Sequence, residues 1–252
     1  MENEQSQPAN GHQPSAISAW LQLLRAPNFL TVPGDPLAGW LLANGSAAVP
    51  DVRLAALLAA SVCFYASGLI LNDVADFETD AAERPSRPLP SRRISVRAAQ
   101  IATGLLLGTG LLLCVCAGGD AFQSGIFLVV AIVAYNQVAK RHAIAGPLVM
   151  GLCRGLNLLL GASLLGIFPA RVWICAAIEI AFIARVTSMA RRETSGGKIT
   201  PKLIGALLSM LIPMQAIFCA VSGAGRIGWI CAAALLILWP LNRVLVRRYY
   251  AS

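Results

Sequence analysis

Long apolar segments separated by short polar loops fill most of this 252-residue chain. A helix that crosses a membrane needs about 20 mainly apolar residues, and eight segments approach that length. The first contains Pro33, Asp35 and Pro36, so we expect a broken or interfacial helix there. The predicted spans are 27–44, 53–71, 97–117, 122–139, 144–167, 171–190, 202–222 and 227–246. The pattern therefore predicts an all-α, polytopic helical bundle.

Composition favours a membrane protein over a soluble one. Hydrophobic residues make up 57% of the chain, charged residues only 13%, and the mean hydropathy is +0.67. Soluble domains carry about 25% charged residues. We therefore expect residues 17–252 to form one transmembrane domain, and the polar residues 1–16 to form a disordered tail.

The positive charges are divided unevenly between the loops. The net charge is +8, but lysines and arginines flank the apolar runs, as membrane orientation requires, so we expect no nucleic-acid partner. With eight spans, fifteen of the 20 lysines and arginines fall on one side of the membrane and three on the other. The positive-inside rule makes the richer side the cytoplasm and puts both termini there. It places the acidic stretch from Asp73 to Glu83, Lys140 and the loop 191–202 on the same side, so these distant segments can meet at one end of the bundle.

Five of the 12 carboxylates lie together between Asp73 and Glu83, directly after the second apolar run. On a helix, Asp73, Asp76 and Asp80 would project from one face. Carboxylates placed side by side repel one another unless a cation lies between them. Mg²⁺ suits this row because it takes oxygen ligands and often bridges them to substrate phosphates. The alternative is a solvated acidic loop that pairs with the arginines following it.

Charged residues inside the predicted spans need an explanation of their own. Arg154 and Asn157 share one helix face, and a buried arginine in a membrane is usually functional. Arg154 either contacts a diphosphate or the aspartates, or forms a structural salt bridge between helices. We expect Asp35 to cap the second half of the broken first helix and Glu179 to be structural, whereas the role of Arg185 stays open. All seven cysteines lie in apolar runs, without the spacing of a zinc site.

The acidic stretch resembles a known family. The pattern N-D-x-x-D-x-x-x-D over Asn72–Asp80, followed by R-P at Arg84 and R-P-L at Arg87, resembles the first aspartate-rich motif of the UbiA superfamily of intramembrane prenyltransferases. Tyr135 and Lys140 are similar to the tyrosine and lysine that end the fourth helix in that family. The resemblance covers nearly all of the chain after the polar tail.

The resemblance implies a helical bundle around a central cavity that opens sideways to lipid. It further implies a prenyl diphosphate held through Mg²⁺, whose loss of diphosphate gives an allylic carbocation that an aromatic or other small acceptor captures. The expected site comprises metal ligands Asp73, Asp76 and Asp80; catalytic residues Asp73, Asp76 and Lys140; and diphosphate-binding residues Asn72, Arg84, Arg154, Asn157, Arg191, Arg192 and Lys198.

The second aspartate-rich motif of the family is absent. Its place, after the sixth predicted span, reads Arg185 to Lys198 without any aspartate and with one glutamate. Either Arg191, Arg192 and Lys198 bind phosphate directly in place of a metal, or the protein has lost the chemistry and keeps only lipid or phosphate binding. The ninth helix that the family usually has is also expected to be missing.

Two functions therefore stay open. The first is a Mg²⁺-dependent prenyltransferase. The alternative is a non-catalytic membrane protein that binds or moves a secondary-metabolite precursor or an isoprenoid lipid. The inverted motif and the segment Cys153–Gly161 resemble the EboC-like branch of the superfamily, which implies a bacterial inner membrane and secondary metabolism. Another phospho-alcohol transferase would also use an aspartate row, but its usual D-G-x-x-A-R signature is absent.

Overall fold

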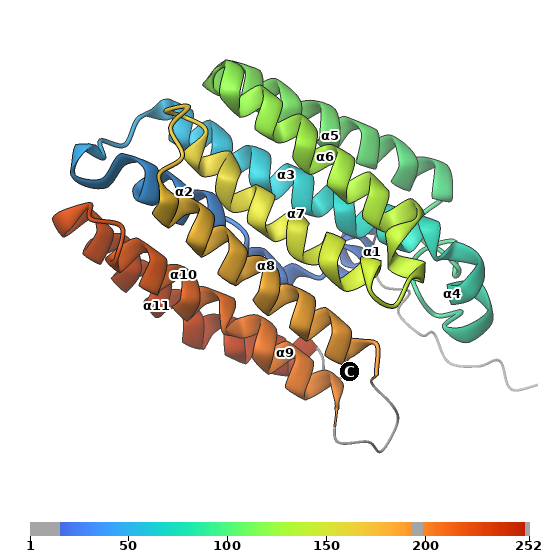
Figure 1. Cartoon of the computed structure of the whole chain (residues 1–252). Coiled ribbons are helices and arrows are strands. Elements are labelled where there is room, and N and C mark those ends of the chain that lie inside the picture. The colour runs from blue at the N-terminus through green and yellow to red at the C-terminus, as the bar shows by residue number, and fades with distance from the viewer. Residues whose placement is uncertain (1–15, 193–198, 250–252) are drawn as a thin grey trace, which may run out of the picture.

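The computed structural model describes residues 16–192 and 199–249, and within these ranges every regular element is a helix (Figure 1). The predicted all-α fold is confirmed. Residues 1–15 of the expected tail, and Lys198, lie outside the described residues. The α-helices are α1 (Ala16–Leu23), α2 (Gly34–Asn44), α3 (Val52–Ala75), α4 (Phe77–Glu83), α5 (Val96–Ala117), α6 (Gly119–Gln137), α7 (Ala145–Ala162), α8 (Ala170–Ala190), α9 (Pro201–Ser209), α10 (Leu211–Ala220) and α11 (Gly225–Tyr249). Three 3-10 helices complete the set: η1 (Ala26–Thr31), η2 (Gly45–Ala47) and η3 (Ala139–Arg141).

Six segments of the described chain are long and apolar enough to cross a membrane, so the expected count of eight spans is only approximate. The expected span 27–44 is broken into η1 and the 11-residue α2. Pro33 and Pro36 lie at this break and lack the N–H groups that a continuous helix would use. The expected span 122–139 corresponds to α6, a 19-residue helix with polar residues at both ends. The six segments are Val52–Ala75, Val96–Ala117, Ala145–Ala162, Ala170–Ala190, Pro201–Ala220 and Gly225–Val244.

The long helices pack side by side as one bundle (Figure 1). α7 packs against α2, α6 and α8, while α3 packs against α5 and α6, and α10 against α11. Figure 1 shows α5 and α6 along one edge of the bundle and α10 and α11 along the other. Since α7 contacts neighbours on several sides, its face toward α3 and α6 lies inside the bundle.

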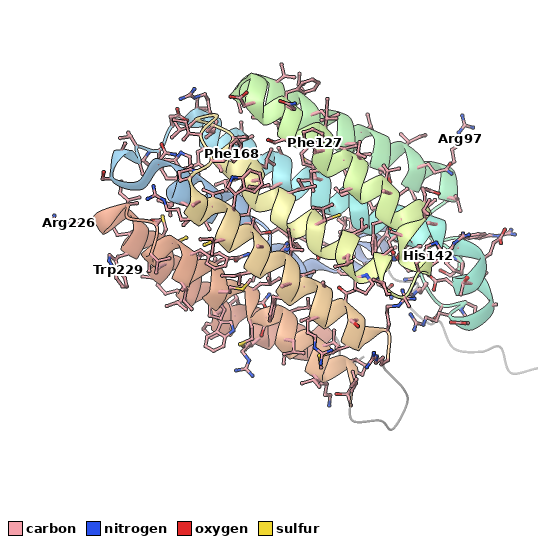
Figure 2. All side chains as sticks on the ribbon, in the orientation of Figure 1. Arg97, Phe127, His142, Phe168, Arg226 and Trp229 are labelled. Carbon is pink, nitrogen blue, oxygen red and sulfur yellow. The ribbon has the colours of Figure 1, made fainter. Side chains whose placement is uncertain are left out.

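Large apolar side chains cover much of the exterior. Leu105 on α5, Trp173 on α8 and Trp229 on α11 are each more than half exposed. Figure 2 shows Trp229 pointing outward, near Arg226 and at the end of the bundle opposite His142. Exposed apolar side chains of this number are unfavourable in water but favourable against lipid tails. The chain is an integral membrane protein.

Two glycines allow the backbones of α2 and α7 to touch. A Cβ atom on Gly161 would overlap the carbonyl oxygen of Pro36, and a Cβ atom on Gly39 would overlap that of Leu158. Small residues commonly permit such close helix packing in membranes. The contact holds α2 against α7 at the level of Asn157 and the following turn.

Candidate functional site

The acidic motif lies where α3 gives way to α4. α3 ends at Ala75, and Asp76 adopts φ −97° and ψ 7° before α4 begins at Phe77. Helical hydrogen bonds nevertheless continue through the junction, from Asp76 N to Asn72 O and from Asp80 N to Asp76 O. The spacing argument assumed that the motif lies on one regular helix, whereas the structure divides it between α3 and α4.

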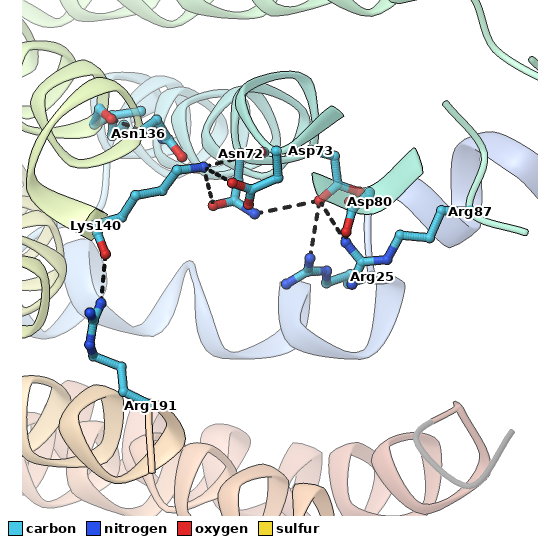
Figure 3. Close-up of polar contacts among 10 residues, drawn as sticks. Arg25, Asn72, Asp73, Asp80, Arg87, Asn136, Lys140 and Arg191 are labelled. Atoms are coloured by element: carbon cyan, nitrogen blue, oxygen red, sulfur yellow. Dashed lines mark hydrogen bonds and ion pairs between the residues drawn. The ribbon is translucent and has the colours of Figure 1, made fainter. Parts of the chain in front are cut away.

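Two of the motif aspartates are paired with arginines of the same chain (Figure 3). Oδ1 of Asp73 lies 3.1 Å from Nη2 of Arg25. Oδ2 of Asp80 lies 2.5 Å from Nη1 of Arg87, which is also 4.0 Å from Oδ1 of Asp73. Asp73 and Asp80 are each only 6% exposed, and carboxylates buried to this degree require paired charges. Neither arginine was among the site residues expected from the sequence.

Lys140 joins the motif to the segment after α8. Its Nζ lies 2.6 Å from Oδ1 of Asp76 and 3.5 Å from Oδ1 of Asn72. Nη1 of Arg191 donates a hydrogen bond of 2.6 Å to the main-chain oxygen of Lys140 (Figure 3). The prediction that these three distant segments meet at one end of the bundle is confirmed. That this end faces the cytoplasm stays a prediction.

Two of the expected phosphate-binding residues have no described ion pair with this network. Arg84 and Arg192 are exposed, and no ion pair within the described residues includes either of them. Lys198 lies outside the described residues. Of the basic residues that replace the second motif, only Arg191 is placed beside the acidic motif by a described contact.

Arg154 and Asn157 belong to a second polar cluster, which is buried between the helices. Nε of Arg154 lies 3.2 Å from Oδ2 of Asp35 and 3.9 Å from Oε1 of Glu179. Nδ2 of Asn157 donates to Oδ2 of Asp35 at 2.9 Å, and Nε2 of Gln215 donates to Oδ1 of the same residue. In this structure Arg154 therefore forms a salt bridge between helices, which is the second of the two interpretations given above.

The expectation that Asp35 caps a helix was wrong. Asp35 lies in the first turn of α2, where a negative charge is favourable, but α2 has no side-chain capping hydrogen bond. The carboxylate is fully buried and faces Arg154, Asn157 and Gln215 instead. A buried charge is stabilised more by a charged partner than by a helix terminus. Glu179 is also fully buried, which agrees with the structural role expected for it.

A cavity of about 230 Å³ lies between α3, α6 and α7 and connects the two polar clusters. Arg25 and Asn72 line it beside the acidic motif, and Arg154 and Asn157 line it elsewhere. The intervening walls are mainly apolar and include Phe64, Leu128, Ile132 and Met150. The central cavity that the family resemblance implied is therefore present.

The donors of the acidic motif fit Mg²⁺ in part. Asp73 and Asp80 offer hard oxygen ligands, and both already face one cationic nitrogen of Arg87. Asp76 instead pairs with Lys140. Accordingly, no group of three His, Cys, Asp or Glu residues in the described part of the chain is arranged to hold a metal. A Mg²⁺ ion held by Asp73 and Asp80 would have to take the place of the Arg87 guanidinium.

Comparison with known proteins shows the family. Residues 36–251 match the model of the UbiA prenyltransferase family. The chain belongs to this family. Among curated relatives, the digeranylgeranylglyceryl phosphate synthases of Sulfurisphaera tokodaii and Methanococcus aeolicus are each 30% identical, over 146 and 152 residues. These matches cover 58% and 60% of this chain and 52% and 53% of the relatives, which is about half of their length.

Solved UbiA-type structures share the fold over nearly the whole chain. A digeranylgeranylglyceryl phosphate synthase studied in membranes has a TM-score of 0.62 at 20% identity, covering 93% of this chain and 91% of its own. A UbiA homologue from Archaeoglobus fulgidus bound to GPP and Mg²⁺ also has a TM-score of 0.62, at 19% identity, covering 92% and 86%. At these identities the similarity shows the fold alone. Membership of the EboC-like branch stays a prediction.

Proposed function

We propose that this protein transfers a prenyl group from a prenyl diphosphate to a small acceptor, and that Mg²⁺ assists the transfer. One observation carries the proposal: the motif Asn72–Asp80 and Lys140 lie together at one end of a cavity with apolar walls. Such a site offers charge for a diphosphate beside an apolar space for a hydrocarbon chain. Family membership and the GPP-bound and Mg²⁺-bound homologue of the same fold support this proposal.

The residues at the motif would divide the work of holding the diphosphate. Asp73 and Asp80 would hold Mg²⁺, which when bound neutralises charge on the departing diphosphate. Arg25, Arg87 and Lys140 supply further positive charge at the same end of the bundle. Guanidinium and ammonium groups form strong hydrogen bonds with phosphate oxygens once they are released from their carboxylates.

The transfer itself exchanges one bond at C1 of the prenyl group. The C–O bond to the diphosphate breaks with both electrons, the acceptor supplies an electron pair to C1, and the acceptor then loses a proton. Water would capture the same carbon. The apolar side chains of Phe64, Leu128 and Ile132 limit water in the cavity and so favour the acceptor.

The position of Arg191 supports direct phosphate binding where relatives of this family are expected to use a second set of aspartates. Arg191 is exposed, and its guanidinium contacts the main chain of Lys140, beside Asp76. A guanidinium there can contact a phosphate oxygen without a metal. Arg192 and Lys198 are proposed to add charge to the same segment.

A second candidate function is binding or movement of a prenylated or aromatic metabolite without chemistry. It is favoured by one observation: each motif aspartate is already neutralised by a cation of the chain itself. In that case the arginines and Lys140 would be permanent partners of the aspartates, and the cavity alone would be functional.

The two candidates are separated by measuring diphosphate release. Purified protein in lipid nanodiscs would be incubated with Mg²⁺, labelled prenyl diphosphates of several chain lengths and a panel of acceptors. We expect release of diphosphate that stops when Mg²⁺ is chelated. If a two-motif family member is active in parallel while this protein releases none, the enzyme proposal fails. Retained binding of the labelled prenyl diphosphate would then support the second candidate.

A further inference from the structure

Three uncharged buried polar atoms of cavity-lining residues have no hydrogen-bond partner among the described residues. They are Oγ of Ser61 on α3, Oδ1 of Asn136 on α6 and Oδ1 of Asn157 on α7. Nε of Arg154, which also lines the cavity, has no hydrogen bond either, but it is ion-paired with Asp35 at 3.2 Å. Ser61, Asn136 and Asn157 are 1%, 3% and 5% exposed. Leaving such an atom unpaired in a protein interior costs about 1–3 kcal/mol. Buried polar atoms of this kind usually meet water or a ligand, and these three line the same space.

Two of these atoms lie at the end of the cavity that is distant from the aspartates. On α3 the cavity wall runs from Asn72, beside the motif, to Ser61, and eleven residues of helix rise about 16 Å. α7 begins beside Lys140, and Asn157 is the cavity-lining residue farthest along it. Ser61 and Asn157 therefore form an inner end, whereas Asn136 lies near the aspartates.

The amide orientation of Asn157 is determined by its neighbours. Its Nδ2 donates to the main-chain oxygen of Val32 at 3.3 Å and to Oδ2 of Asp35 at 2.9 Å. Both partners are acceptors, so the NH₂ group has to face them and the oxygen has to face away. Asn157 lines the cavity, so its unpaired acceptor belongs to the cavity wall.

The charges behind the inner end disfavour an anion there. The guanidinium of Arg154 is matched by Asp35 at 3.2 Å and by Glu179 at 3.9 Å. Two carboxylates against one guanidinium leave no surplus positive charge for a phosphate or a carboxylate. A neutral group that donates a hydrogen bond fits this environment, since the unpaired atom of Asn157 is an acceptor.

We propose that the inner end of the cavity binds a neutral hydroxyl group carried by a small apolar molecule. A hydroxyl can donate to Oδ1 of Asn157 and accept from the hydroxyl of Ser61. The walls formed by Phe64, Leu128 and Ile132 suit the apolar remainder, and a volume of about 230 Å³ suits a small molecule. The binding site is a property of the cavity and stands whether or not the protein transfers prenyl groups.

The test compares two probes of nearly equal size that differ in one hydrogen-bond donor. 4-Propylphenol and 4-propylanisole would be titrated calorimetrically into nanodiscs that contain the protein, with empty nanodiscs subtracted for partition into lipid. We expect the phenol to bind about tenfold more tightly, as one or two net hydrogen bonds provide. Equal binding of the two probes would overturn the proposal.

Variants locate the recognition within the cavity. Ser61→Ala removes an unpaired hydroxyl, so the fold should be unaffected, and Asn157→Leu removes the acceptor. We expect Asn157→Leu to reduce the preference for the phenol to about twofold or less, and Ser61→Ala to weaken the binding of both probes, since either probe's oxygen can accept from the serine hydroxyl. Ser163→Ala is the matched control, because Ser163 is equally buried but donates to the main-chain oxygen of Leu160 outside the cavity. If Asn157→Leu does not fold, Ser61→Ala decides alone, and an unchanged affinity for 4-propylphenol there overturns the proposal.

A competition experiment assigns the hydroxyl to one of two sources. With geranyl diphosphate at saturation and Mg²⁺ chelated, simultaneous binding of 4-propylphenol indicates the hydroxyl of an acceptor. Mutual exclusion indicates a hydroxyl at the far end of a prenyl chain. Diphosphate release without any preference for the phenol would overturn this proposal alone and leave prenyl transfer intact.

Discussion

Nη1 of Arg87 lies between two motif carboxylates, 2.5 Å from Oδ2 of Asp80 and 4.0 Å from Oδ1 of Asp73. A guanidinium therefore holds the position in which a divalent cation would bind the same two residues. The guanidinium and the metal compete, because each neutralises carboxylates that are nearly buried. This competition predicts how metal affinity responds to substitution.

Replacing Arg87 by glutamine should tighten the binding of a divalent cation to the motif. The substitution removes a charge-assisted hydrogen bond, worth about 1.5–3 kcal/mol, that stabilises only the metal-free state. The affinity for the cation should therefore rise about tenfold or more. Mn²⁺ titration followed by electron paramagnetic resonance measures this directly. Arg84→Gln is the control, since Arg84 is exposed in the same loop and should leave the affinity unchanged. Weaker Mn²⁺ binding by Arg87→Gln would contradict the competition.

Substitution of Asp73 by asparagine should abolish most of the proposed prenyl transfer. The amide keeps the shape of the side chain but removes the charge that Arg25 and a bound cation require. We expect the rate of diphosphate release to fall by about 100-fold or more, as when a transition-state charge loses its partner. Glu78→Gln, an exposed acid of the same stretch, should retain the rate. An equal loss of rate in both variants would show that the total negative charge of the stretch matters, and not the motif aspartate in particular.

The buried cluster should be essential for stability. Arg154→Met leaves Asp35 and Glu179 buried without their cation, and removal of one partner from a buried pair costs about 3–5 kcal/mol. Unfolding in mixed detergent and SDS micelles measures the change. Arg185→Met is a suitable control, because Arg185 also lies within a span but is exposed. A comparable loss in the control would mean that any arginine in these helices matters equally.

The contact between α2 and α7 should be sensitive to a single methyl group. Gly161→Ala places a Cβ atom against the main chain of Pro36, so overpacking should destabilise the protein by about 1–3 kcal/mol. Gly104→Ala, on α5, meets nothing within 4 Å and should be neutral or slightly stabilising in its helix. The same unfolding assay compares them. Equal stability of the two variants would show that the contact can relax.

Local patterns were sufficient to predict the helical bundle, the acidic motif and its meeting with Lys140. Apolar runs, regular spacing and the distribution of arginines and lysines are all properties of short segments. Arg87 follows the motif closely, and the alternative of an acidic loop paired with the following arginines anticipated its contact with Asp80. The charge map thus indicated which segments share one end of the bundle, but not which atoms pair.

The pairing of residues in the second polar cluster could not be predicted, because its members are far apart in the sequence. Asp35 lies 122 residues from Asn157 and 180 residues from Gln215. Nothing in the neighbourhood of Gln215 marks it as a partner of a buried carboxylate. The nearby prolines favoured a local role for Asp35 as a cap, and tertiary pairing with Arg154 prevailed over that local preference.

The close contact at Gly39 and Gly161 also restricts how this cavity can be remodelled. Asn157 lies on α7 within the stretch where that helix rests directly on the backbone of α2. α7 cannot move away from the cavity to lengthen it, because its main chain already contacts the main chain of α2. Relatives that accommodate a longer molecule in this space would have to change side chains such as Phe64 and Leu128 on the opposite walls. Selectivity for the length of the bound molecule would then change through side chains of α3 and α6, while the position of α7 stays the same.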